Sequence, residues 1–472
     1  MRFHTAMVGA TMLMVSTSSV AQDASENQDV DIAAILKDLQ SEVQGLRDDN
    51  ASMRGEIEEL RILNQDEWIT ERRSEEIRGI VQDVLADADT RASLQGNGLS
   101  AGWSNGFFLA SPDGRFRLNI GGQMQTRFVW NYHDEPDTTR YGFENTRTKL
   151  LFDGHVFSPD WEFSIETDFA RDGGSATLLD SWIRHNFNNE ISLRAGQFKM
   201  PFSRESLVDA SQQLVIERSL IDLAMGVGRT QGIELRIENP VHRILVAVTD
   251  GSQDNLGSDA GFTLARTQRP FPLNSPALVE DVEYAFAARY ELLMAGNWNQ
   301  FKDFTSSETG EYGVLFGVAF QGQESEYGTP TADDVDWVAW TADISMEFGG
   351  ASLFASFTHH YIDRVTFTGN IYGVVGQGSI YITPKLEFYA RYEYGWTDFN
   401  LAVGSIERSD LGVLTIGTNY YLDGHDLKWS TDLGIGFTQV EDFWSSDRAG
   451  YRADTEDSEP QFVLRTQLQL LF

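Results

Sequence analysis

The chain of 472 residues has no cysteine, only 11 prolines, and 36 lysines and arginines against 71 aspartates and glutamates. Without cysteine it cannot form disulfide bonds, thiolate metal sites or cysteine nucleophiles. The formal net charge of −35 argues against a nucleic-acid partner, because that binding relies on basic patches that displace counterions. The catalytic motifs H-E-x-x-H and G-K-[ST] are also missing, and G-x-S-x-G occurs only in the run GLSAGWSNG at 98–106, which we read as part of a linker. We therefore expect no enzyme, no catalytic residues, no metal and no cofactor.

Long hydrophobic runs are missing as well, which excludes transmembrane helices of the usual 18 or so apolar residues. The N-terminus is a different case. Arg2 is followed by a short apolar core from Ala6 to Val15 and by the small-residue sequence Ser19-Val20-Ala21. This order is typical of a secretory signal peptide, which we place at residues 1–21. The protein is therefore expected to be exported.

A heptad pattern follows the signal peptide and predicts an α-helical coiled coil in the periplasm over residues 22–66. Apolar residues alternate at spacings of four and three, with Asn50 and Asn64 at a-type positions where a buried amide fixes register. The pattern does not decide between two and three strands, and a single amphipathic helix is the alternative. Residues 67–106 are expected to form a further helical segment and a linker. The seam positions are Ile32, Leu36, Leu39, Val43, Leu46, Asn50, Met53, Ile57, Leu60 and Asn64.

The rest of the chain is dominated by alternation with a period of two. In the closing stretch QFVLRTQLQLLF (461–472), one parity is almost entirely apolar and the other is mostly polar. The same pattern returns at 115–130, 161–170, 385–396 and 427–437. A period of two is that of a β-strand whose two faces meet different surroundings.

Two features favour a membrane barrel over a soluble β-sandwich. The alternating runs reach about ten residues or more, which is the length of membrane-spanning strands. Tryptophans stand near strand ends, as in the aromatic girdles of such barrels: Trp130, Trp161, Trp337 and Trp396. We therefore predict an all-β fold over residues 107–472, a transmembrane antiparallel β-barrel of about 16 strands, in contact with outer-membrane lipids.

Short turns and long polar loops alternate along the barrel region, as they do in outer-membrane proteins. The join around 292–310 is too long for a tight turn, and a misreading there would change the strand count by two. The last strand is expected to pair with the first, near 115–130, and Phe472 resembles the terminal signal of outer-membrane barrels. The predicted long loops are 131–145, 171–177, 200–230, 250–281, 321–335, 362–370, 397–410 and 440–460.

Residues 145–221 resemble the phosphate-selective porin O/P family. The runs RAGQFKMPFSRE (194–205) and VIERSL (215–220) carry the resemblance, which extends over 107–472. It implies a trimeric channel of sixteen strands whose third loop folds inward and narrows the lumen. The predicted loop 200–230 is the third long loop. Members of the family select anions such as phosphate with ladders of arginine and lysine.

We therefore predict an outer-membrane porin for passive diffusion of small hydrophilic solutes, with small anions such as phosphate as candidate solutes. General diffusion stays open, because carboxylates including Glu162, Glu166, Glu205 and Glu217 could neutralise the lumenal cations. A structural role, with the coiled coil linking the membrane to the cell wall, is the alternative function. The predicted constriction and anion-binding residues are Arg127, Lys149, Arg184, Arg194, Lys199, Arg204, Arg218 and Arg229.

Overall fold

The computed structural model describes residues 99–472 except 104–105, 134–137, 172, 252–280, 308, 327–333, 365–366, 402–405, 408 and 455–459, together with ten residues between 37 and 55. The chain divides into two units, Met1–Gln95 and Gly96–Phe472. The predicted signal peptide, the coiled-coil seam and the predicted helix of 67–95 lie outside the described residues. The ten described residues of 37–55 are helical and exposed, and all of them fall between the predicted seam positions.

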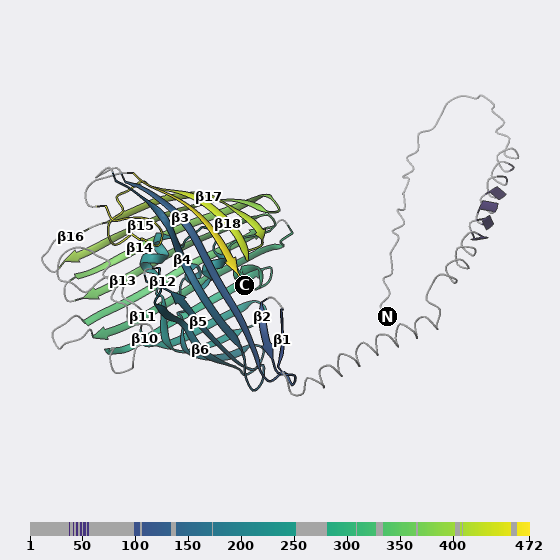
Figure 1. Ribbon diagram of the computed structural model, residues 1–472, viewed down its shortest axis with the longest axis horizontal. Coiled ribbons are helices and arrows are strands. Elements are labelled where there is room, and N and C mark those ends of the chain that lie inside the picture. The colour runs from purple at the N-terminus through teal and green to yellow at the C-terminus, as the bar shows by residue number, and fades with distance from the viewer. Residues whose placement is uncertain are drawn as a thin grey trace, which may run out of the picture. The chain divides into compact units, whose positions relative to one another are not determined.

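Sixteen strands form a closed barrel within the described part of the second unit (Figure 1). Each strand is antiparallel to its neighbours. The predicted strand number is therefore confirmed. The strands are β3 (Arg117–His133), β4 (Thr138–His155), β5 (Trp161–Phe169), β6 (Ala176–Asn186), β7 (Ile191–Lys199), β8 (Arg229–Glu238), β9 (His242–Thr249), β10 (Asp281–Ala295), β11 (Tyr312–Glu326), β12 (Asp334–Phe348), β13 (Ala351–Arg364), β14 (Phe367–Thr383), β15 (Leu386–Leu401), β17 (Asp410–Asp423), β18 (Leu427–Gly436) and β19 (Gln461–Leu471).

The barrel closes where β19 pairs with β3, in a register that runs from Phe462 opposite Tyr132 to Leu471 opposite Gln123. This is the closure that the sequence predicted. At the end of the seam the backbones of Phe472 and Gly122 exchange two hydrogen bonds of 3.1 and 2.8 Å. A side chain at Gly122 would collide with the Phe472 ring, so the glycine makes room for the terminal aromatic.

The alternation along each strand separates an apolar outer face from a polar inner face. In β19, Leu464, Leu468 and Leu470 are exposed on the outside, whereas Arg465 and Gln469 are buried inside. An exposed apolar face on a closed barrel is the arrangement that a lipid bilayer requires. Among the described residues there is no helix with the length and apolar content to span a membrane.

A small hairpin precedes the barrel, made of β1 (Ser100–Trp103) and β2 (Phe107–Ala110). β2 pairs with the start of β3, from Arg117 to Ile120, below the point where β19 ends. The expected linker over 96–106 therefore contains a strand. The predicted long loop at 362–370 is also too long, because β13 and β14 extend to 364 and from 367.

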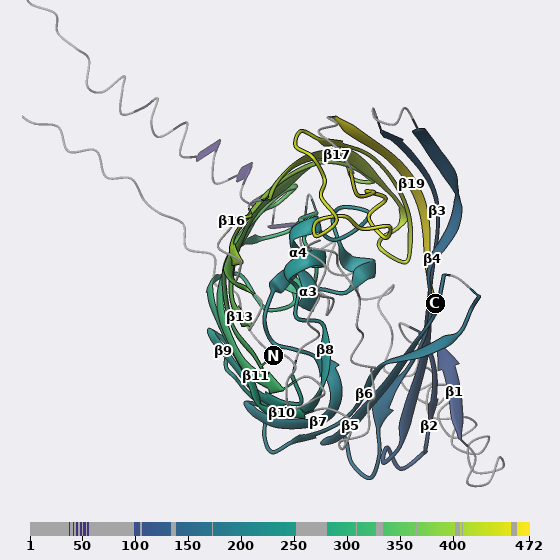
Figure 2. The same cartoon turned by 90° about the vertical axis from the view of Figure 1, so that its left-hand side faces the viewer.

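Three connections fold into the barrel. We call residues 200–228 the inner loop, residues 437–454 the second inner loop, and residues 296–307 the inner connection. The inner loop carries α3 (Arg204–Leu207), η1 (Ala210–Gln212) and α4 (Leu220–Met225), and the inner connection carries η2 (Gln300–Lys302). Figure 2 shows α3 and α4 inside the ring of strands, beside the yellow second inner loop. The remaining short strand, β16 (Ile406–Glu407), pairs with the end of β15.

Candidate functional site

The inner loop has a defined backbone. The side chains of Ser203, Asp209 and Ser219 each accept a backbone N–H from the helical turn that follows. Such caps satisfy N–H groups that a short helix leaves without a partner. The third long loop therefore folds inward as an ordered structure, as the family resemblance implied.

Hydrogen bonds from many strands hold the inner loop in place. Arg289 donates to Phe202 O (2.8 Å), and Lys428 donates to Gln213 O (3.0 Å). These bonds fix the loop against an arc that runs from β10 through β19 to β4. The side chains of this arc that bond to the loop are Gln125, Arg147, Arg289, Ser345, Arg391, Glu393, Asn419, Lys428 and Gln469. Lys199 of β7 bonds to the loop from the other side.

Apolar side chains fill the space between the inner loop and this arc. Ile221 and Met225 of the loop belong to one buried cluster with Phe443, Trp444 and Tyr451 of the second inner loop. Trp444 also donates its Nε1 to Ser409 Oγ (3.0 Å). The second inner loop is therefore part of the barrel interior, whereas the sequence predicted only a polar outer loop at 440–460.

Glycines on the inner face of the wall receive these side chains. A Cβ atom at Gly395 would lie 2.6 Å from the Trp444 ring and 2.7 Å from Ile221 Cδ1. A side chain at Gly373 would collide with Ile221, and one at Gly434 with the Tyr451 hydroxyl. Both inner loops thus meet the wall at positions without a side chain.

The inner connection reaches the inner loop from the opposite end of the barrel. Arg204 donates to Phe301 O (2.8 Å) and Asp303 O (3.3 Å), and the ring of Phe304 packs at a tilt against Phe354 of the wall, with 4.8 Å between the ring centres. The doubtful join at 292–310 is therefore one connection, and the strand count stands. We call the region lined by β10 to β19 and occupied by these three segments the filled half of the lumen.

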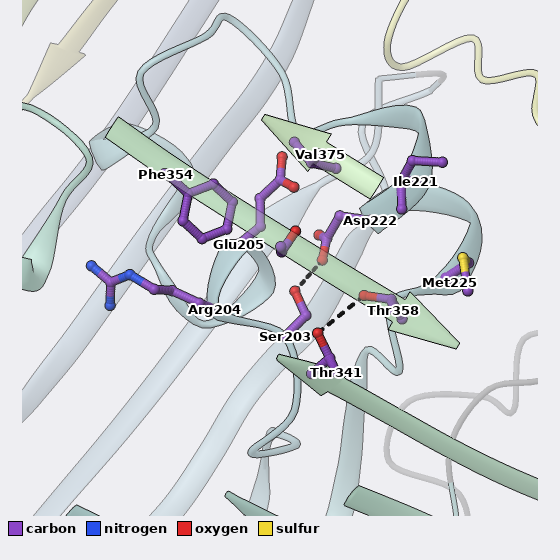
Figure 3. A pocket seen from close by; sticks show the side chains of 11 residues that line it. Ser203, Arg204, Glu205, Ile221, Asp222, Met225, Thr341, Phe354, Thr358 and Val375 are labelled. Carbon is purple, nitrogen blue, oxygen red and sulfur yellow. Dashed lines mark hydrogen bonds between the residues drawn. The ribbon is translucent and has the colours of Figure 1, made fainter. Parts of the chain in front are cut away.

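A small pocket remains within the filled half, between the inner loop and β12 to β14 (Figure 3). Ser203 and Ser206 donate to the Asp222 carboxylate, and Thr341 and Thr358 share a hydrogen bond of 3.1 Å across the strands. Burial and the nearby charge of Asp222 together raise the pKa of Glu205 to about 7. Glu205 accepts from Ser219 N and Oγ. The pocket therefore belongs to the network that stabilises the inner loop.

The opposite side of the lumen has charged side chains in place of an apolar filling. We call the inner face of β4 to β8 the charged wall, and five of the eight predicted cations lie on it. Lys149 contacts Glu166 (2.7 Å), and Arg229 contacts both Glu166 (3.3 Å) and Asp180 (2.7 Å). The described charged residues of this wall include Lys149, Glu162, Glu166, Asp168, Asp180, Arg184, Arg194, Lys199, Arg229, Glu234, Arg236 and Glu238.

Arg184 and Arg194 lie on the same wall, nearer to the short turns. They stand opposite each other on β6 and β7. Each forms an ion pair with a carboxylate on the strand at its other side: Arg184 with Glu162 of β5 at 3.2 Å, and Arg194 with Glu234 of β8 at 2.7 Å. The sequence had named Glu162 and Glu166 as counterions that could neutralise the cations.

The remaining predicted cations have different surroundings. Arg127 is buried and pairs with Glu144, and Arg204 is buried within the filled half. Arg218 lies on the inner loop, 3.7 Å from Asp222. Lys199 donates to Leu207 O (3.4 Å) and has no ion-pair partner in the described part of the chain.

The charges that act on Lys199 come from Lys149, Asp209, Arg218 and Arg229. The structure thus brings Lys149, Lys199, Arg218 and Arg229 together where the inner loop faces the charged wall. It does not bring Arg127 or Arg204 to that place.

One buried carboxylate of the inner loop, Glu217, lies among arginines that favour its ionised form. Burial would raise the pKa of Glu217, but Arg147, Arg448 and Arg127 lower it well below its usual value. Arg147 donates to Glu217 at 2.6 Å. Sequence reasoning did not identify this pair, because the two residues lie 70 positions apart.

One aromatic prediction is wrong. Trp337 is buried inside the barrel against His360, so it is not part of a girdle. Its parity, opposite to that of the exposed Trp340, could have shown this. The second inner loop was also missed, although its adjacent Phe443 and Trp444 are unusual in an otherwise polar stretch.

The closed barrel of sixteen strands with inward-folded loops defines a porin channel of the outer-membrane type. The model of the family described as phosphate-selective porin O and P matches residues 118–309 of this chain, which supports a relation to that family. The resemblance seen in the sequence is therefore confirmed.

Individual proteins give more distant similarities. A protein of Aquifex aeolicus (strain VF5), described as uncharacterized, is 23% identical over 258 residues, which are 52% of this chain and 59% of that protein. The chain therefore spans less than two thirds of that relative's length.

Among solved structures, an anion-selective porin from Comamonas acidovorans aligns with a TM-score of 0.52 and 13% identity, over 75% of this chain and 99% of that one. The outer membrane channel DcaP of Acinetobacter baumannii aligns with a TM-score of 0.48 and 13% identity, over 75% of this chain and 97% of that one. At these identities the first of the two supports the fold alone.

Proposed function

We propose that this porin conducts small hydrophilic solutes by passive diffusion with a weak preference for anions, and that the passage runs between the inner loop and the charged wall. The observation that carries the proposal is the cluster of Lys149, Lys199, Arg218 and Arg229 on both sides of that gap. The apolar packing of the filled half supports the same route, because hydrated solutes avoid a dry apolar core. A channel of this kind performs no chemical step, so we propose no enzyme activity.

The charge balance of the cluster explains why the preference should be weak. Four carboxylates, Glu166, Asp180, Asp209 and Asp222, stand against the four cations at close range. In one of these ion pairs the cation is the more exposed partner, because the Arg218 side chain is 14% exposed and that of Asp222 only 4%. In a narrow passage with low-dielectric walls, such local charges decide which ions enter, whatever the net charge of the chain.

Phosphate is a candidate solute for a chemical reason. A guanidinium group offers parallel N–H donors that match two phosphate oxygens, and two of the four cations are arginines. The family's description names phosphate selectivity, and for this chain it is a proposal. It predicts that phosphate added to a chloride solution reduces the chloride current.

Single-channel recording in a potassium chloride gradient tests the proposal. The native chain should give a reversal potential of the sign that indicates anion selectivity, and Lys199→Gln or Arg218→Gln should move that potential toward zero. Lys385→Gln is a matched control, because it also removes one positive charge. Lys385 lies at an exposed short turn, where its Nζ donates to Leu422 O. A cation-selective reversal potential in the native chain would exclude the anion preference and leave the porin fold intact.

We propose further that the porin is a homotrimer and that the predicted coiled coil of 22–66 lies in the periplasm. The helical and exposed residues between 37 and 55 support the helix, and the family resemblance supports the trimer. Sedimentation of the detergent-solubilised chain with and without residues 22–95 tests both. A trimer in the full chain is expected, and a monomer at high micromolar concentration would contradict it.

A further inference from the structure

One tryptophan of the charged wall has no part in the filled half. Trp182 on β6 shares the inner face with Asp180 and Arg184, and it is partly exposed. The buried tryptophans Trp337 and Trp444 are both packed in the apolar cluster. Trp182 is therefore an indole that borders the proposed passage.

The wall beside Trp182 carries almost no side chains. In the row across the sheet, Trp182 stands opposite Ser164 on β5 and Gly196 on β7, and Gly196 stands opposite Gly232 on β8. A Cβ atom at either glycine would collide with the backbone of the next strand, so the close approach of the strands requires glycine there. The row therefore has about two strand spacings, roughly 10 Å, of backbone without side chains next to the indole. Phe198, two residues beyond Gly196 on β7, is buried beside it, and its ring centre lies 4.2 Å from the guanidinium carbon of Arg194.

Cations stand on either side of this row. Toward the inner loop, Asp180 holds Arg229 at 2.7 Å. Toward the short turns, the guanidinium carbons of Arg184 and Arg194 lie 4.7 and 5.6 Å from the Trp182 ring centre. Rows of the same face are two residues apart, or about 7 Å. A solute that leaves the cation cluster therefore meets first an indole and then two guanidinium groups.

Arg184 and Arg194 have donor capacity for one more anion. They are like charges in directly opposed positions, which is unfavourable unless anions lie close by. Each has one carboxylate partner, which it contacts through a single terminal nitrogen, and the two side chains are 18% and 15% exposed. Because Glu162 and Glu234 already balance the two charges, a single negative charge fits better than two.

We propose that Trp182, Arg184 and Arg194 form a solute subsite for ring-bearing monocarboxylates such as benzoate. The guanidinium groups take the carboxylate, and the ring lies against the indole and the bare backbone of Gly196 and Gly232. Offset or edge-to-face packing of two aromatic rings gives the preference for a planar ring over an aliphatic group. This inference rests on the proposed function, and it names a solute class for the same passage.

The test uses the full-length chain as single channels in a planar bilayer, with chloride as the current carrier. Benzoate, cyclohexanecarboxylate and acetate are added at matched concentrations, so that all three carry one charge and only benzoate has an aromatic face. Benzoate should reduce the current at about fivefold lower concentration than cyclohexanecarboxylate, and acetate should be the weakest. Equal effects of benzoate and cyclohexanecarboxylate would overturn the subsite, and this comparison needs no variant.

Variants then locate the effect. Trp182→Leu should weaken the benzoate effect about fivefold and leave the acetate effect unchanged, whereas Trp182→Phe should keep it within about twofold. Trp429→Leu is the control, because that indole is exposed on the outer face of β18. An unchanged benzoate effect in Trp182→Leu would mean that the indole only orders the two arginines, which also overturns the proposal. Failure of the proposed function looks different, because the native chain would then show no current or cation selectivity before any benzoate is added.

Discussion

The filled half and the charged wall are built from strands of the same kind, yet their inner faces differ in a simple respect. The filled half has glycines at Gly373, Gly395 and Gly434, where loop side chains enter the wall. The charged wall has long charged side chains that pair across neighbouring strands, such as Lys149 with Glu166. One barrel therefore contains both a dry apolar core and a wet ionic surface.

The difference shows how an inward loop can be fixed without closing a channel. Small residues on one side let the loops pack to the density of a protein interior. Charged residues on the other side are costly to bury without full pairing, so they favour water beside them. The glycines that receive loop side chains lie on β14, β15 and β18, away from the wall beside which we propose the passage.

The largest difference between the two regions should appear when an ion pair is broken. Arg289 is fully buried in the filled half, where it contacts Asp343 (2.8 Å) and Glu291 (2.9 Å). Arg289→Met leaves two buried carboxylates without their cation and should cost about 3–5 kcal/mol in the free energy of unfolding. Guanidinium-induced unfolding in detergent measures the loss.

Arg184→Met is the matched variant on the charged wall. Its partner Glu162 has a side chain that is 37% exposed, so the pair is partly in water. The expected cost is about 0–1 kcal/mol. Equal costs for Arg289→Met and Arg184→Met would contradict the distinction between a filled and a wet region.

A smaller effect is expected at the glycine where both inner loops meet the wall. Gly395→Ala places a methyl group within 2.7 Å of Trp444 and Ile221. Overpacking of this kind costs about 1–3 kcal/mol, and displaced loops should increase the noise of the open-channel current. Gly376→Ala on β14 is the control, because nothing lies within 4 Å of its added methyl group. Identical open-channel current noise in Gly395→Ala and Gly376→Ala would show that the loops do not need glycine at position 395 to pack against the wall.

The smallest effect concerns pH, through a residue of the inner loop. Burial raises the pKa of Glu205 from an ordinary value of 4.5 to about 7. The folded state then binds the proton more tightly than the unfolded state. The stability from this group is therefore full below pH 4.5 and is lost as the pH rises to about 7.

Glu205→Gln removes this dependence, because the amide does not ionise. Its stability relative to the native chain should therefore rise between pH 5 and pH 8. Unfolding midpoints at the two pH values measure the change. A constant difference between the two proteins would contradict the raised pKa.

Much of the barrel could be predicted from the sequence because the alternation is local. The pairing of β19 with β3 also followed, since a closed barrel must join its last strand to its first. Trp337 was misassigned because its position near a strand end outweighed its parity. The inward course of 437–454 depends on packing against Gly395, which is far away in the sequence and carries no signal of its own.

The candidate site was predictable in its residue types and not in its partners. Lys149, Arg184 and Arg194 were expected in the lumen from parity and Arg229 on the third loop, and the structure has all four on one wall. Whether a cation is neutralised depends on strand register and on the loop's path. Arg204, for example, was expected at the constriction, but it bonds to the inner connection, whose fold no local pattern announces.

Thiol labelling tests most directly whether the passage runs along the charged wall. The native chain has no cysteine, so it serves as the control that the reagent does not label. Glu162→Cys places a thiol on the charged wall at a side chain that is 37% exposed, and Thr415→Cys places one in the filled half at a residue that is 1% exposed. An anionic methanethiosulfonate reagent should reduce the single-channel current of Glu162→Cys and leave that of Thr415→Cys unchanged. A fall in the current of Thr415→Cys, with none in Glu162→Cys, would contradict the account.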